Sequence, residues 1–248
     1  MTMQISALRH QRPVQPIPVP MTLQPTACPA VLPAARPAAA VGDDVFALAA
    51  ETQTLERDEV LFYEGDDARS VYRIVEGMVR TSILLPDGRR YVVDFLQAGD
   101  IVGLTASDTH TYTAEAVTPV TLSRMSRRKL DDAVAVRPGL GRKMLATIQS
   151  DLVAAHERLL LLGRKSVTER LASFLLILRD RQPADKAPTR VVHLPMGRTD
   201  IADYLGLTIE TVSRTFTKLK TAGVIRLIDT YEVAILDPDQ LAVIAAGK

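Results

Sequence analysis

The sequence has almost none of the residues from which disulfide or metal-thiolate frameworks are built. Cysteine occurs once, as Cys28, and tryptophan is absent. One thiol cannot close a disulfide, form a zinc cage or supply the four thiolates of an iron–sulfur cluster. An unpaired cysteine fits a reducing compartment. We therefore expect a fold held together by an ordinary hydrophobic core.

Long apolar runs are also missing. No stretch approaches the roughly 18 residues that a membrane span needs, and the N-terminus lacks the contiguous apolar core of a signal peptide. We therefore expect a cytoplasmic protein without membrane contact. The length of 248 residues leaves room for two modest domains and a tail.

Excess charge of one sign is small but unevenly placed. The net charge of +1 argues against a general nucleic-acid coat. Residues 164–230 nevertheless hold 12 Lys and Arg against 7 Asp and Glu, a local net of +5, which leaves −4 for the rest. This excess is compatible with a DNA-binding segment and also with an ordinary solvated surface.

Residues 1–42 lack acidic and aromatic side chains altogether and contain 8 of the 15 prolines. Proline interrupts helices and strand ladders, and such a composition offers little apolar surface for a core. We predict a disordered, proline-rich tail.

Residues 43–136 have the pattern of short strands separated by turn residues. Pro86-Asp87-Gly88 lies between two alternating runs and predicts a hairpin, because proline presets φ and glycine accepts a positive φ. Turns recur every 8 to 12 residues, which is typical of an antiparallel sandwich or jelly roll. The strands are expected at 59–63, 71–75, 78–85, 91–96 and 120–124.

Residues 137–163 change to the period of a helix, in which apolar residues recur at spacings of 3, 4, 3, 4 and 3 before Gly163 interrupts it. Such a narrow stripe predicts a helix that pairs with its copy across a two-fold axis. The alternative is a helix packed on its own domain, which usually has a wider apolar face. The predicted dimer seam consists of Leu145, Ile148, Leu152, Ala155, Leu159 and Leu162.

Residues 164–248 predict a winged helix-turn-helix domain. Ala202, Gly206 and Val212 have the spacing of that motif, with a small residue where the helices cross, a turn residue tolerant of left-handed φ and a branched residue beneath the second helix. Thr208 is expected to cap the second helix, which runs to about Lys220. Two strands within 224–236 would form the wing.

Subtracting the buried positions leaves Glu210, Ser213 and Arg214 on the outer face of this helix, in its first two turns. That part of a recognition helix reaches base edges in the major groove, where Arg reads guanine, Glu accepts from cytosine and Ser serves either edge. The alternative is a solvated face of a structural helical hairpin. Residues expected to contact the DNA backbone are Thr199, Thr208, Thr211, Thr215, Thr217, Lys218 and Lys220.

Residues 196–219 resemble the recognition region of the FNR/FixK branch of the CRP/FNR superfamily, which uses Glu-x-x-Ser-Arg for half-sites of the TTGAT type. The resemblance extends over residues 46–236, with Gly77 and Leu96-x-x-Gly-Asp100 in the roll. It implies an α+β protein with a cyclic-nucleotide-binding-like β-roll, a dimerisation helix and a winged helix that recruits RNA polymerase. It further implies a homodimeric regulator, of activator type, that binds TTGAT-N4-ATCAA and controls genes for low-oxygen respiration or nitrogen fixation.

Two departures from the family pattern bear on cofactors. FNR itself needs several N-terminal cysteines for its cluster, whereas this chain has only Cys28. Nucleotide-binding members carry a Gly-Glu run and an Arg-Ser pair around the phosphate. Residues 105–112 read Thr-Ala-Ser-Asp-Thr-His-Thr-Tyr, so a cyclic phosphate would lack its charged partner. We therefore expect no cofactor, with control by the amount of protein.

Two other interpretations were weighed. An enzyme of the cupin type would need clustered metal ligands, but His10, His110, His156 and His193 are scattered in the sequence. A sensor of the same fold would hold haem or a small metabolite in the roll. The interior of a roll is apolar whether its own side chains or a ligand fill it, so the sequence leaves this interpretation open.

Overall fold

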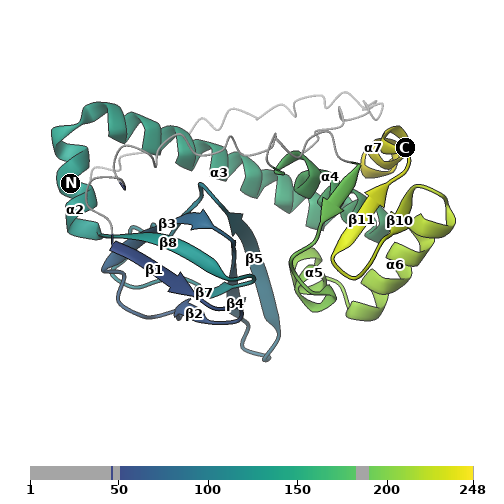
Figure 1. Ribbon diagram of the computed structural model, residues 1–248, viewed down its shortest axis with the longest axis horizontal. Coiled ribbons are helices and arrows are strands. Elements are labelled where there is room, and N and C mark those ends of the chain that lie inside the picture. Colours follow the sequence, from purple (N-terminus) through teal and green to yellow (C-terminus); the bar gives the residue numbers. More distant parts are fainter. Residues whose placement is uncertain (1–45, 47–50, 183–189, 248) are drawn as a thin grey trace, which may run out of the picture. The chain divides into compact units, whose positions relative to one another are not determined.

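A computed structural model describes Phe46, residues 51–182 and residues 190–247 (Figure 1). It contains a roll of strands, two consecutive helices, and a group of helices with a small sheet at the C-terminal end. This confirms the predicted α+β class. The predicted tail at 1–42 lies outside the described residues.

The roll consists of two four-stranded antiparallel sheets. One sheet has the order β1 (Glu51–Leu55), β8 (Val120–Ser126), β3 (Ser70–Glu76) and β6 (Ile101–Val102). The other has the order β2 (Val60–Phe62), β7 (Thr113–Ala116), β4 (Met78–Leu84) and β5 (Arg90–Gln97). Every second side chain of a strand points to the same face. The buried core of the roll includes Leu55, Phe62, Ile74, Val79, Leu96, Val102, Val120 and Leu122.

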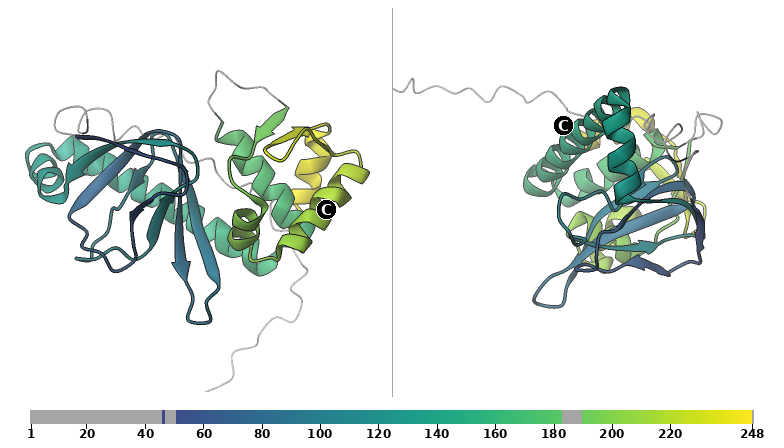
Figure 2. Two further views of the ribbon diagram at one scale, coloured as in Figure 1. Left: turned by 60° about the horizontal axis from the view of Figure 1, so that its bottom comes forward. Right: turned by 90° about the vertical axis from the view of Figure 1, so that its left-hand side faces the viewer.

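The hairpin predicted at Pro86-Asp87-Gly88 is present. Strands β4 and β5 pair from Met78 opposite Gln97 to Leu84 opposite Arg90, with a register shift after Thr81. The hairpin projects beyond the neighbouring strands of the roll (Figure 2). Arg80 lies opposite Phe95 near the base of the hairpin, and Arg90 lies opposite Leu84, next to its turn.

Two helices follow the roll. Helix α2 (Arg127–Val136), capped by Ser126, falls inside the segment predicted as roll, and the sequence analysis missed it. Its only fully buried side chain is Leu130. Helix α3 (Pro138–Arg164) starts with proline in its first turn and ends one residue after Gly163, where the interruption was predicted. Although α3 has 27 residues, neither it nor another helix of the described chain is apolar enough to cross a bilayer.

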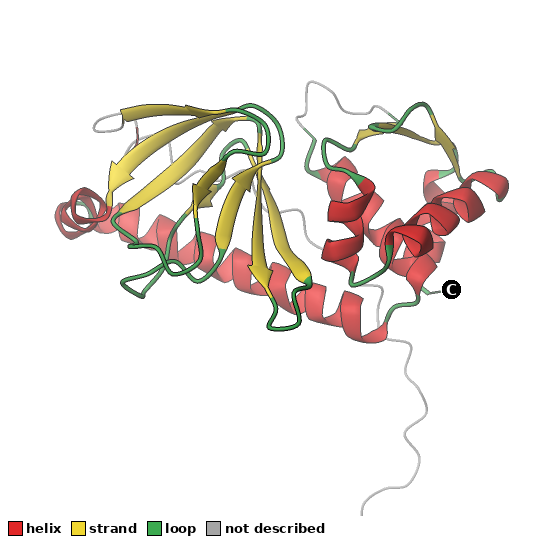
Figure 3. Ribbon diagram, turned by 90° about the horizontal axis from the view of Figure 1, so that it is seen from below, coloured by secondary structure: helices red, strands yellow, loops and turns green. Residues whose placement is uncertain are grey.

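The C-terminal domain packs helices against a three-stranded sheet (Figure 3). Helix α4 (Val167–Asp180) is followed by β9 (Val191–His193), α5 (Arg198–Leu205) and α6 (Ile209–Thr221). The predicted wing is formed by β10 (Ile225–Leu227) and β11 (Glu232–Ile235), which pairs with β9 on its other side. The terminal helix α7 (Pro238–Ala245) was not predicted. The core includes Leu171, Phe174, Leu175, Val192, Leu194, Ile201, Val233 and Leu241.

Gly77 separates β3 from β4 at the closest backbone approach among the roll's glycines. Its φ is +92°, and a Cβ placed there would lie 2.3 Å from the carbonyl oxygen of Pro119. Gly88, at the hairpin tip, has a φ of +83° with open space around it. The two positions therefore share a backbone conformation that disfavours side chains but differ in the room available.

We predict that Gly77→Ala destabilises the protein more than Gly88→Ala. The unfavourable φ costs roughly 1–2 kcal/mol at either site. Crowding at Gly77 adds about 1–3 kcal/mol, because backbone atoms must move. Urea denaturation of both variants measures the difference. Equal losses of unfolding free energy would show that the backbone at Gly77 yields freely.

Candidate nucleic-acid interface

The two helices of the motif are joined by a tight turn. Gly206 ends α5 with a φ of 63° and a ψ of 42°, which a residue without Cβ adopts readily. Thr208 then caps α6, and its hydroxyl accepts a hydrogen bond from the Thr211 backbone N–H at 3.2 Å. The predicted turn residue and the predicted cap are both present.

The inner side of α6 is closely packed against α5. Val212, Phe216 and Leu219 are buried, as are Ile201 and Leu205 on α5. Ala202, the predicted small residue of the motif, is buried as well. This packing fixes which side of α6 faces outward.

Glu210, Ser213 and Arg214, the three predicted base-reading residues, are all exposed on the outward side of α6. A hydrogen bond from its own backbone N–H, followed by one from the Thr208 side chain and by the charge of Arg214, lowers the pKa of the Glu210 carboxyl. Glu210 is therefore an anionic acceptor at neutral pH. One helix face thus presents an acceptor, a hydroxyl and a guanidinium fork, the groups that pair with base edges.

The residues predicted to contact the DNA backbone divide into two groups. Those exposed around the helix-turn-helix are Thr199, Thr208, Thr217, Lys218 and Lys220. Thr211 is half-buried and shares a hydrogen bond with Thr208. Thr215 has to be corrected: it is 5% exposed, and its hydroxyl donates to the Thr211 carbonyl at 2.7 Å. Its position three residues after Val212 places it on the packed side.

Two arginines that the sequence analysis missed support the motif from within. The Arg198 guanidinium lies 3.7 Å from the centroid of the Phe216 ring, beneath α6. Arg170 on α4 donates to the carbonyl of Leu205 at 3.1 Å and to that of Leu162 at 2.8 Å. Arg170 therefore links the last turn of α5 to the last turns of α3. Neither role leaves a local pattern, because the partners lie on other helices.

The apolar stripe on α3 is largely uncovered in the single chain. Leu145, Ile148 and Leu152 are each about half exposed, and Leu159 is 69% exposed. Ala155 is exposed between them. Leu162, the last predicted seam residue, is instead partly buried against the C-terminal core. Val153 and Leu160, which directly follow the seam residues Leu152 and Leu159, are also exposed and widen the stripe.

The family pattern implies that a cyclic phosphate would bind at the turn between β6 and β7. The centre of this turn is filled by His110, which is 4% exposed and stacks on Phe62 with ring centroids 3.5 Å apart. The same imidazole lies 3.2 Å from where a Cβ on Gly103 would be. Residues 103–112 contain no arginine or lysine, and their only charged side chain is Asp108. These residues do not fit a cyclic nucleotide.

The described residues also hold no cluster of three histidine, cysteine or carboxylate side chains arranged to hold a metal ion. Of the histidines considered above, His156 and His193 are exposed and far from His110 in the sequence, and His10 lies outside the described residues. The ligand set that a cupin-type enzyme needs is therefore not found in 51–182 or 190–247.

Comparison with known proteins gives the same two parts. A cyclic nucleotide-binding domain model matches residues 52–136, and a Crp-like helix-turn-helix domain model matches residues 169–244. The nitrogen fixation regulation protein FixK of Bradyrhizobium diazoefficiens is 43% identical over 189 residues, covering 76% of this chain and 79% of the relative. This chain belongs to the CRP/FNR family.

FixK-like members are among its similar relatives in this family. The transcriptional activatory protein AadR of Rhodopseudomonas palustris is 41% identical over 76% of this chain and 79% of its own length. The solved structure of FixK2 from Bradyrhizobium japonicum aligns with a TM-score of 0.74 and 36% identity, covering 79% of this chain and 98% of that one. The chain is therefore a DNA-binding transcription regulator of the FixK/FNR type, and these relatives are regulators, not enzymes.

We predict that His110 makes the roll less stable in mild acid. Burial lowers the pKa of the His110 imidazole, so the folded state holds this proton less tightly than the unfolded state does. Unfolding free energy is then unaffected above the ordinary pKa of about 6.5 and decreases as the pH falls below it.

Denaturation curves at pH 7.5 and pH 5.5 measure this effect. His110→Phe, which keeps a ring against Phe62, should reduce the loss of stability between the two pH values. His156→Gln, which replaces an exposed histidine, is the control. An unchanged loss in His110→Phe would refute the assignment.

Proposed function

We propose that this protein is a FixK-type transcription activator that binds a palindromic TTGAT-N4-ATCAA site as a homodimer. In this proposal it recruits RNA polymerase to genes of low-oxygen respiration or nitrogen fixation. The observation that supports it most directly is the exposed set Glu210, Ser213 and Arg214 on a helix whose other side is packed. Relatives named as nitrogen fixation regulators support the choice of genes.

Base reading would work through α6 lying in the major groove. Arg214 would donate two parallel hydrogen bonds to guanine, and anionic Glu210 would accept from the amino group of cytosine. The exposed threonines and lysines around the motif would neutralise and contact phosphates, which fixes the register without reading sequence. The Arg198 contact beneath Phe216 supports a rigid recognition helix.

Dimerisation would bury the apolar stripe of α3 against its copy. A contiguous row of half-exposed leucine and isoleucine side chains is unfavourable in water and marks an interaction surface. Pairing along a heptad stripe gives two-fold symmetry, and a palindromic site has the same symmetry. The two recognition helices would then enter successive major grooves about one turn, or ~34 Å, apart.

DNA binding is proposed to need neither cyclic nucleotide nor iron–sulfur cluster. In the turn where a phosphate would bind, His110 is buried and stacks on Phe62 of β2, and the roll interior is packed with apolar side chains. The only cysteine, Cys28, cannot ligate a cluster by itself. Purified protein without added effector should therefore give a footprint on the proposed palindrome.

We predict that Arg214→Ala weakens specific binding by roughly 1–3 kcal/mol and relaxes the preference at one base pair of each half-site, because the guanidinium fork is lost. Lys218→Ala is the comparison, since loss of a phosphate contact should weaken all sequences alike and flatten the salt dependence. Fluorescence anisotropy with single-base variants of the palindrome measures both. Unchanged base preference in Arg214→Ala would remove this side chain from the reading set.

We predict that Leu152→Asp weakens the dimer and with it DNA affinity, because a carboxylate would be buried in the paired stripe. Val136→Asp is the matched control, since Val136 is 80% exposed at the end of α2 and lies off the stripe. Sedimentation velocity over a concentration series gives the dimer constant. Full dimerisation of Leu152→Asp would contradict the proposed seam.

A further inference from the structure

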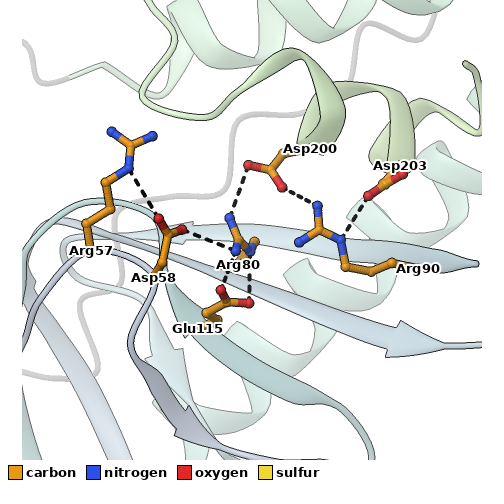
Figure 4. Close-up of polar contacts among 7 residues, drawn as sticks. All are labelled: Arg57, Asp58, Arg80, Arg90, Glu115, Asp200 and Asp203. Atoms are coloured by element: carbon orange, nitrogen blue, oxygen red, sulfur yellow. Dashed lines mark hydrogen bonds and ion pairs between the residues drawn. The ribbon is translucent and has the colours of Figure 1, made fainter. Parts of the chain in front are cut away.

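The densest group of charges in the described chain lies between the roll and α5 (Figure 4). Arg90 on β5 donates to Asp200 at 2.5 Å and to Asp203 at 2.9 Å. Arg80 on β4 donates to the other oxygen of Asp200 at 3.1 Å. Asp200 and Asp203 are both on α5, so two adjacent strands of the roll hold one face of the first helix of the motif. We call these four residues the α5 clamp.

The clamp is anchored on the roll side as well. Arg80 donates to Glu115 on β7 through two nitrogens and to Asp58 at 3.3 Å. Arg80 and Asp200 are each 9% exposed, whereas Arg90 and Asp203 are 29% and 23% exposed. The buried pair lies behind a half-buried pair, so solvent screens the inner contacts least.

A second set of contacts holds the same helix from α3. The Arg158 guanidinium of α3 lies over the ring of Tyr204 on α5. Its central carbon is 5.1 Å from the centroid of that ring. Arg158 also pairs with Asp94 on β5 at 3.0 Å and donates to the carbonyl of Val93. Tyr204 packs on Phe95 of the roll with ring centroids 5.3 Å apart. Helix α5 is thus fixed to the roll and to the proposed dimer helix together.

These contacts reach the recognition helix through packing. The opposite side of α5 carries Ile201, Ala202 and Leu205, which pack against α6. A buried ion pair adds little net stability, because desolvation opposes the attraction, but its geometry is specific. The clamp therefore has more effect on where α6 lies than on whether the domain folds.

Half-site spacing depends on where α6 lies. In a dimer paired along α3, each base pair added between the half-sites moves them apart by about 3.4 Å and rotates them by about 35°. A recognition helix fixed to the dimer helix cannot follow that change, but one on a loose domain can. We infer that the α5 clamp selects the spacer length of the DNA site, with Arg90 and Asp203 as positioning residues. This inference rests on the proposed function.

The experiment measures affinity for palindromes with the same half-sites and spacers of two to six base pairs. Arg90→Asp breaks the clamp and should reduce the discrimination between the best spacer and its neighbours roughly tenfold. Arg89→Asp is the matched control, because Arg89 is adjacent, 77% exposed and paired with Asp87 at the hairpin tip. It should keep the wild-type discrimination.

The double variant Arg90→Asp with Asp203→Arg restores an ion pair in reversed order and should recover the spacer preference. Asp203→Asn is the milder single variant if Arg90→Asp does not fold, and it should lose part of the discrimination. A wild-type spacer profile in Arg90→Asp or, failing that, in Asp203→Asn overturns the inference. So does an equal loss in Arg89→Asp, or a loss that charge reversal does not recover.

The same data separate this inference from the proposed function. If the wild type binds no palindrome selectively, or Arg214→Ala leaves base preference intact, the proposed function fails. If half-site base preference is retained in every clamp variant while the spacer profile stays unchanged, only the clamp assignment fails.

Discussion

A guanidinium group keeps its charge inside a protein, so a fold that buries one must also bring carboxylates to it. At Arg80 this requirement joins segments far apart in the chain, because the carboxylates come from Asp58, Glu115 and Asp200. The first two belong to the roll and the third to α5. Satisfying one arginine therefore places the DNA-binding motif against the roll.

That constraint explains why α5 has two unlike faces. One face, with Ile201 and Leu205, completes the hydrophobic packing under α6. The other, with Asp200 and Asp203, meets arginines from the hairpin β4–β5. A helix of eight residues that is held on both sides has little freedom to tilt. In this arrangement fixed contacts connect the roll to the DNA-binding domain.

Local sequence patterns predicted most of the fold. The strands flanking Pro86-Asp87-Gly88, the heptad stripe of α3 and the landmarks of the helix-turn-helix each leave a local pattern that one element satisfies by itself. Helix α2 was missed because it buries only Leu130. Thr215 was misplaced, although its spacing from Val212 and Leu219 already put it on the packed side of α6.

The clamp had no comparable local signal. Asp200 looks like an ordinary first-turn acidic residue, which favours the positive end of the helix dipole, and Asp203 follows in the second turn of the same helix. Their partners lie 110 to 120 residues earlier in the chain. Leu162 is partly buried for a related reason, because Arg170 and the turn at Gly206 lie against the end of α3 beside the C-terminal core. Tertiary contacts decided both cases.

Two kinds of DNA specificity would then come from separate surfaces of one motif. Base identity would be read by the outward side chains of α6, whose exposure lets them vary without disturbing the core. Spacing would be set by the roll-facing side chains of α5, which are buried or half-buried among charges and cannot change singly without removing an ion pair of Arg80 or Arg90. A sequence preference could therefore shift by single substitutions, whereas a spacing preference would require paired ones.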